Sequence, residues 1–144
     1  MAIAIERDSP PVRAGAFGPQ WDLGDEEIEQ LTEVIRAGKL SRLGGTKVNQ
    51  FEKDFAAKQG VKYAQAVTSG TAAVHTAIGV IDPNPGDEII TTSITDFGTV
   101  IGILYQNAVP VFADIDPVSG NLDVNDVAAK ITERTKAIVL VHLY

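Results

Sequence analysis

The segment Val67-Thr68-Ser69-Gly70-Thr71-Ala72-Ala73 decides the fold, because it joins a strand-like run to a helical pattern. The residues before it, 62–67, are typical of a short strand. The apolar residues after it recur at helical spacing: Val74, Ala77, Ile78 and Ile81. A strand, a small hydroxyl-rich turn and a helix in this order predict one unit of an α/β domain.

The turn itself, Ser69, Gly70, Thr71 and Ala72, has two interpretations. The first backbone N–H groups of a helix have no partner within the helix, so a turn at this place suits an anion, most often a phosphate. Serine and threonine also favour helix starts simply because their oxygens cap the first turn. The turn alone does not separate an anion site from plain capping.

The rest of the chain repeats the strand and helix alternation. Strands are predicted at 62–67, 87–91, 109–113 and 136–141. Helices are predicted at 25–37, from about residue 48, and at 71–81, 97–106 and 123–131. The fold class is therefore α/β, with a parallel-rich sheet and flanking helices. The apolar run at 137–141 is typical of a strand buried on both faces of such a sheet.

The domain organisation follows from the proline positions and the chain length. Residues 1–22 contain Pro10, Pro11 and Pro19 and are expected to form an extended N-terminal arm. Residues 23–144 are long enough for one domain with its own core. If no further chain covers the sheet, we expect the strand at 137–141 to lack a partner and to expose an apolar edge.

Composition excludes several classes of protein. The formal charge is −7 without a basic cluster, which argues against nucleic-acid binding. There is no cysteine, no signal peptide is recognised at the N-terminus, and no apolar run approaches membrane-spanning length. We therefore expect a soluble cytoplasmic protein with no membrane partner.

Other candidate chemistry is weaker. No dinucleotide or P-loop glycine motif is present. Asp114 and Asp116 form a pair that could hold a divalent cation, as in a metal-dependent sugar transferase, but turn capping explains them better, so no metal is predicted. His75 and His142 are expected to be structural. The seven lysines all lie in charged or loop-like contexts, so none is expected to form a Schiff base and no catalytic residue is assigned.

Several separate motifs together resemble the DegT/DnrJ/EryC1/StrS aminotransferases, from about Trp21 onward. The matching segments, in family order and spacing, are 44–52 (GGTKVNQFE), 70–75 (GTAAVH), 85–90 (PGDEII), 110–117 (PVFADIDP), 131–139 (ITERTKAIV) and 141–144 (VHLY). This family consists of pyridoxal-phosphate enzymes of the aspartate-aminotransferase fold type.

The resemblance implies a function. The parent enzyme would transfer an amino group from glutamate or glutamine to a nucleotide-linked keto sugar or cyclitol, using pyridoxal 5′-phosphate, and would be a homodimer. Thr71 and Ala72, with Ser69 and Gly70, would hold the cofactor phosphate. The N-terminal arm and the loop at 39–47 would reach the neighbouring subunit.

The sequence departs from the family pattern at two places. Asp96 stands where relatives present an aromatic ring to the cofactor, and Phe97 follows it, so either residue is expected beside the cofactor. The family's Schiff-base lysine and ring-pairing aspartate come after the last strand. The resemblance therefore implies that residues 23–144 are an incomplete large domain that binds pyridoxal phosphate, and that this chain is the N-terminal part of a longer enzyme and inactive alone. The alternative is a non-catalytic, phosphate-ligand-binding or degenerate module of the same fold.

Overall fold

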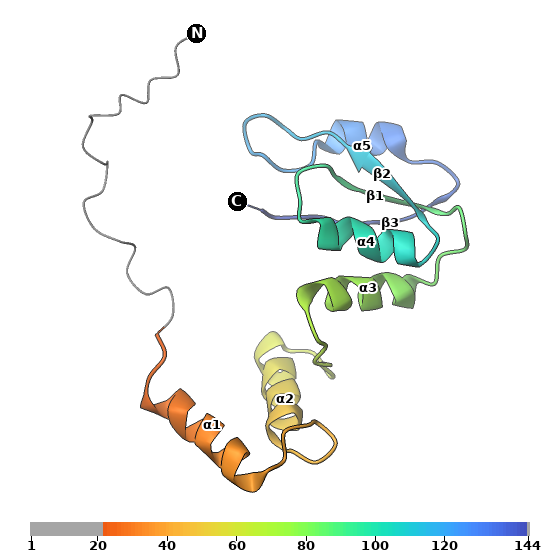
Figure 1. Cartoon of the computed structure of the whole chain (residues 1–144). Coiled ribbons are helices and arrows are strands. Elements are labelled where there is room, and N and C mark those ends of the chain that lie inside the picture. Colours follow the sequence, from red (N-terminus) through yellow and green to blue (C-terminus); the bar gives the residue numbers. More distant parts are fainter. Residues whose placement is uncertain (1–21, 144) are drawn as a thin grey trace, which may run out of the picture. The chain divides into compact units, whose positions relative to one another are not determined.

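The computed structural model describes residues 22–143 (Figure 1). They fall into two compact units that divide between Ala64 and Gln65, and each unit is described by itself. None of the helices in residues 22–143 is long and apolar enough to cross a membrane. The predicted N-terminal arm lies almost entirely outside the described residues and stays a prediction.

The first unit contains two helices, as predicted. Helix α1 spans Asp25–Ala37 and α2 spans Lys47–Gln59. Each ends at a glycine in the left-handed conformation, Gly38 with φ 64° and Gly60 with φ 67°, which a residue with a side chain adopts less readily. The apolar stripe of α1 is exposed in the described chain.

The second unit is a parallel α/β layer structure. Its elements in chain order are α3 (Gly70–Ile81), β1 (Glu88–Thr92), α4 (Phe97–Tyr105), β2 (Val109–Ala113), α5 (Val124–Lys130) and β3 (Thr135–Ile138). The strands form one parallel sheet in the order β2-β1-β3. β1 pairs with β2 from Glu88↔Val109 to Thr92↔Ala113, and with β3 on its other side. This arrangement confirms the predicted fold class, and the helices fall within a residue or two of their predicted bounds.

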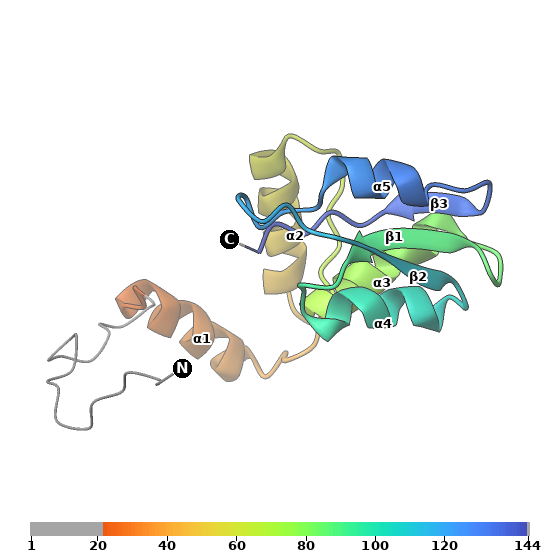
Figure 2. The ribbon, with the colours of Figure 1, turned by 90° about the horizontal axis from the view of Figure 1, so that it is seen from above.

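The central strand β1 explains how the layers are held. Its alternate side chains point to opposite faces, so Ile89 packs with Ile78 of α3 and Ile103 of α4, while Ile90 packs with Ala113 and Leu122 on the other face. Figures 1 and 2 show the result, with α3 and α4 on one side of the sheet and α5 on the other.

Two strand predictions are wrong. Residues 62–67 form no strand, because no strand edge in the described chain pairs with them. The last strand is shorter than predicted, and only one of its faces is covered. Ala137 and Val139 pack against the α3 and α4 side, whereas Ile138 is 47 % exposed. β3 does have a partner, β1, so the expectation that the last strand lacks one is wrong; its other edge pairs with no strand of residues 22–143.

A buried carboxylate joins the amino ends of β1 and β3. Glu88 is 6 % exposed, accepts a hydrogen bond from the Thr132 hydroxyl at 2.6 Å and is paired with the Arg134 guanidinium. The Thr132 hydrogen bond and then Arg134 lower the pKa of Glu88 below its ordinary value of 4.5. Residues more than forty positions apart are thereby tied together.

We expect Glu88→Gln to lower the melting temperature at neutral pH and to flatten its dependence on pH. A carboxylate with a lowered folded pKa stabilises the fold above its unfolded pKa, and that stability is lost as the pH falls through the folded pKa. Thermal melts from pH 7 down to pH 3 measure the effect. Glu133→Gln is the control, because Glu133 is exposed. Parallel curves for wild type and Glu88→Gln would contradict the prediction.

Candidate functional site

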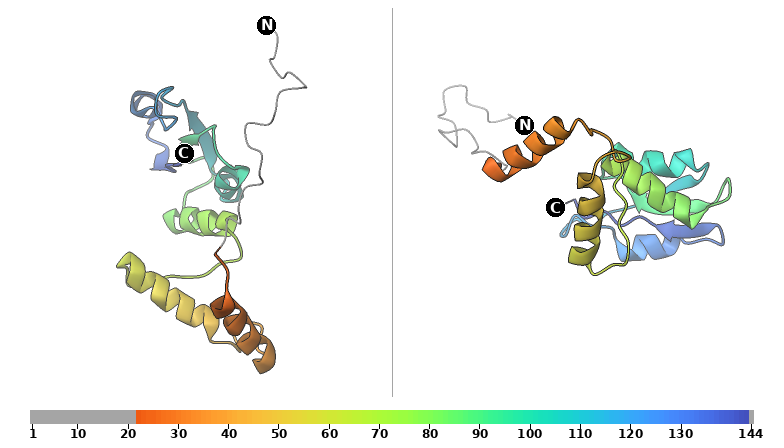
Figure 3. Two further views of the ribbon diagram at one scale, coloured as in Figure 1. Left: turned by 90° about the vertical axis from the view of Figure 1, so that its left-hand side faces the viewer. Right: turned by 90° about the horizontal axis from the view of Figure 1, so that it is seen from below.

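The starts of α3 and α4 lie next to each other. Residue numbers rise in both helices from one contact to the next: Gly98 lies beside Thr71, Gly102 beside His75 and Ile78, and Gln106 beside Gly79. The helices are therefore parallel, and both begin at the same end of the unit. Figures 2 and 3 show them side by side. Since α4 follows the carboxyl end of β1, this end is the carboxyl edge of the sheet, where open α/β sheets bind their ligands.

The predicted turn stands at the start of α3. Ser69 is the residue that caps the helix, and its hydroxyl accepts a hydrogen bond from the Ala72 N–H at 3.1 Å. The Ala73 N–H donates to the Ser69 carbonyl at 3.0 Å. The capping interpretation of Ser69 is therefore confirmed.

Two donors of this turn remain available. Within the described chain, the Gly70 and Thr71 N–H groups have no hydrogen-bond acceptor, and both residues are exposed. They also lie at the positive end of the helix dipole. The turn therefore offers an anion two backbone N–H donors and the Thr71 hydroxyl, which is a donor set that fits a phosphate.

The start of α4 holds the other two predicted residues. Asp96 caps the helix, and its Oδ1 accepts a hydrogen bond from the Gly98 N–H at 2.7 Å. Through this hydrogen bond the Asp96 side chain serves as the N-cap of α4. Phe97 begins the helix, and the residue is 64 % exposed. The sequence thus placed both residues at the same edge as the turn.

Gly98 was missed by the sequence reasoning. A Cβ built there would lie 2.5 Å from the Thr71 hydroxyl oxygen and 2.6 Å from Asp96 Oδ1, so both oxygens occupy the space beside this glycine. The available signal was the spacing of Gly98 and Gly102, four residues apart on one helix face. Such spacing lets a neighbouring helix approach closely.

Asp116 and His75 make structural contacts. Asp116 Oδ1 accepts hydrogen bonds from the Val118 and Ser119 N–H groups, so it caps the turn that follows β2. Residues 22–143 contain no group of three or more acidic or histidine side chains able to hold a metal ion. His75 shares a hydrogen bond of 2.8 Å with the Gln106 side chain, and its ring lies 5.4 Å from that of Tyr105.

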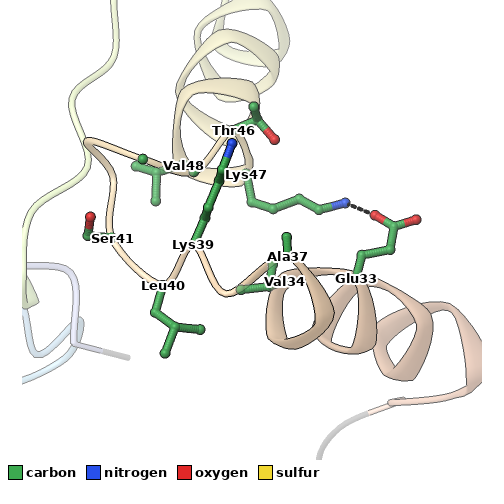
Figure 4. Close-up of a pocket in the computed structure, with 11 residues that line it drawn as sticks. Glu33, Val34, Ala37, Lys39, Leu40, Ser41, Thr46, Lys47 and Val48 are labelled. Carbon is green, nitrogen blue, oxygen red and sulfur yellow. Dashed lines mark hydrogen bonds and ion pairs between the residues drawn. The ribbon is translucent and has the colours of Figure 1, made fainter.

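A separate pocket lies in the first unit, between α1, α2 and the loop that joins them (Figure 4). Its volume is about 320 Å³. Lys47 extends from α2 to Glu33 of α1 at 2.5 Å, and Lys39 and Ser41 come from the joining loop. This loop contains the segment that the resemblance assigns to a subunit contact.

Comparison with known proteins agrees with this architecture. The spore coat polysaccharide biosynthesis protein SpsC of Bacillus subtilis is 48 % identical over 120 residues, which are 83 % of this chain and 30 % of that protein. GDP-perosamine synthase of Caulobacter vibrioides is 45 % identical over 132 residues, 92 % of this chain and 35 % of that protein. The aminotransferase from Psychrobacter cryohalolentis superposes with a TM-score of 0.82 at 34 % identity, over 89 % of this chain and 32 % of that one.

The chain thus spans about a third of the length of these relatives. Residues 22–144 match the family model of the same aminotransferases that the sequence motifs resemble. With the parallel sheet and the paired helix starts, this match is decisive: the chain belongs to the DegT/DnrJ/EryC1/StrS aminotransferase family.

Proposed function

We propose that this chain supplies the phosphate-anchoring part of a pyridoxal-phosphate-dependent aminotransferase that acts on a nucleotide-linked keto sugar or cyclitol. The observation that carries the proposal is the pair of N–H groups at Gly70 and Thr71, which have no acceptor among residues 22–143 and lie at the carboxyl edge of a parallel sheet. Family membership supports the reaction class, and the name of a relative, GDP-perosamine synthase, supports a nucleotide-linked sugar as the class of acceptor.

Each site residue has a defined task in this proposal. Gly70 and Thr71 donate their N–H groups to the cofactor phosphate. Ala72, which the resemblance also assigns to the phosphate, gives its N–H to the Ser69 hydroxyl and so fixes the turn. Asp96 orders the start of α4 beside that turn, and the exposed ring of Phe97 borders the cofactor. Bound pyridoxal phosphate supplies the electron sink for breaking bonds at the α-carbon of an amino acid.

The other parts of the proposal concern the whole enzyme. Glutamate or glutamine is the amino donor, and the Schiff-base lysine comes from outside these 144 residues, so the 144-residue chain is inactive alone. The enzyme is a homodimer, in which the N-terminal arm and the loop at 39–47 contact the neighbouring subunit. The absence of cysteine agrees with a cytoplasmic location.

The test uses the full-length protein purified from its natural source. We expect it to carry bound pyridoxal phosphate with a visible absorbance band that borohydride removes. The band should change when glutamate or glutamine is added and return when a nucleotide-linked keto sugar follows. A protein that binds the cofactor but leaves the band unchanged with either donor would favour the non-catalytic alternative. A protein that binds no cofactor would refute the proposal.

A further inference from the structure

We propose that Gly98 is a positioning residue for the phosphate-binding turn, because its missing side chain leaves the space in which the Thr71 hydroxyl and the Asp96 carboxylate stand. The inference rests on the proposed function, since it concerns how the same turn is held. It adds a residue that contacts no phosphate itself and acts through its two neighbours.

The first step is steric. An alanine Cβ at position 98 would lie 2.5 Å from Thr71 Oγ1, 2.6 Å from Asp96 Oδ1 and 3.4 Å from Thr71 Cβ. The first two distances are shorter than real Cβ contacts, so at least one neighbour would have to move. The backbone of Gly98 is that of an ordinary helical residue, without a positive φ. Glycine is therefore required here because a Cβ would clash with its neighbours, and not because of the backbone conformation.

The second step is that neither neighbour moves freely. Asp96 Oδ1 is held by the Gly98 N–H at 2.7 Å, and displacing it removes the cap of α4. Thr71 is β-branched and lies in the first turn of α3, so few rotamers are open to it. An added methyl group would therefore press on Thr71, whose own N–H is one of the two free donors of the turn.

The third step separates Gly98 from the other glycines of these two helices. A Cβ at Gly102 would lie 3.1 Å from the His75 Cα and 3.2 Å from Ile78 Cδ1, so Gly102 sets the spacing of the helices away from the turn. A Cβ at Gly79 would meet only the Gln106 side chain, at an ordinary 3.7 Å. The chain thus provides a packing variant and a neutral variant for comparison.

The experiment compares the affinities of the full-length apoprotein for pyridoxal 5′-phosphate and for pyridoxal, which lacks the phosphate. The dissociation constant for pyridoxal divided by that for pyridoxal 5′-phosphate measures the preference for the phosphate form. This ratio separates phosphate anchoring from contacts with the ring. We expect Gly98→Ala to reduce this ratio about tenfold with a melting temperature close to that of Gly79→Ala. Gly102→Ala should lower the melting temperature and keep the wild-type ratio. If Gly98 had only a structural role, Gly98→Ala would give this same result.

The outcomes distinguish the two proposals. If the wild type prefers the phosphate form but Gly98→Ala keeps that preference within about twofold, the inference about Gly98 is wrong and the proposed function stands. If the wild type itself has no preference for the phosphate form, both proposals fail. If Gly98→Ala does not fold, T71S is compared with T71S/G98A, since serine has no branching methyl group and can turn its hydroxyl away from the new Cβ more easily than threonine. The double variant should then show about a threefold lower ratio, and equal ratios would overturn the inference.

Discussion

Gly70→Asp is expected to weaken the binding of pyridoxal 5′-phosphate about 100-fold, which corresponds to about 2.7 kcal/mol. A Cβ at Gly70 would meet nothing within 4 Å, so the new side chain fits without a clash. Its carboxylate would occupy the N–H groups of the turn and repel the phosphate. The same charge at a helix start stabilises the fold by about 0.3–1 kcal/mol, so the melting temperature should not fall. Titration of the full-length apoprotein with the cofactor measures the loss.

Val124→Asp is the matched control. Val124 is the first residue of α5, is 76 % exposed and follows an aspartate that caps the helix, so the substitution adds the same charge at the same helix position. It should leave the affinity for the cofactor unchanged. Equal losses in both variants would show that overall charge, and not the turn at Gly70, governs binding.

Ile103→Ala is expected to lower the free energy of unfolding by about 3 kcal/mol. Ile103 has no exposed surface and packs with Ile78, Ile89 and Ala108 in the cluster between the sheet and the two helices. Removing its side-chain methyl groups leaves a cavity, since a parallel sheet and two closely packed helices have little freedom to collapse around it. Urea unfolding of the full-length protein, followed by circular dichroism, gives the value.

The control for this prediction is Val118→Ala. Val118 lies in the turn after β2 and is 94 % exposed, so its truncation should change the free energy of unfolding by less than about 0.5 kcal/mol. A loss of similar size in both variants would mean that the cluster around Ile103 is not the principal core of this unit.

The helices were predictable because their signals are local. Gly38 and Gly60 end their helices, and Ser69 and Asp96 cap theirs, through contacts within a few residues. The central and edge roles of the strands depend on which strands are neighbours. For this reason the sequence failed to show that 62–67 is unpaired and that Ile138 is exposed.

The site was predicted only in part, for the same reason. The turn at Ser69 is local and was found from the sequence, although its anion binding stays a prediction. The place of Asp96 or Phe97 beside the cofactor was implied by the family resemblance and stays a prediction. The role of Asp96 as the cap of α4 depends on the geometry of the loop after β1. The contact of Gly98 with Thr71 joins two different helices. The spacing of Gly98 and Gly102 signals a close neighbouring helix, but not which residue of that helix Gly98 meets.

The buried residues of the main hydrophobic cluster lie close together in the sequence. This affects the order in which the unit can fold while the chain is being synthesised. The cluster's buried members lie between Ile78 and Ala108, and the two helix starts that meet at Gly98 fall in nearly the same stretch. Contacts between residues close in sequence form quickly, and chains emerge from the ribosome with the N-terminal side first. The paired helix starts can therefore assemble on the nascent chain before β3 has emerged from the ribosome, and β3 then adds to an edge already in place.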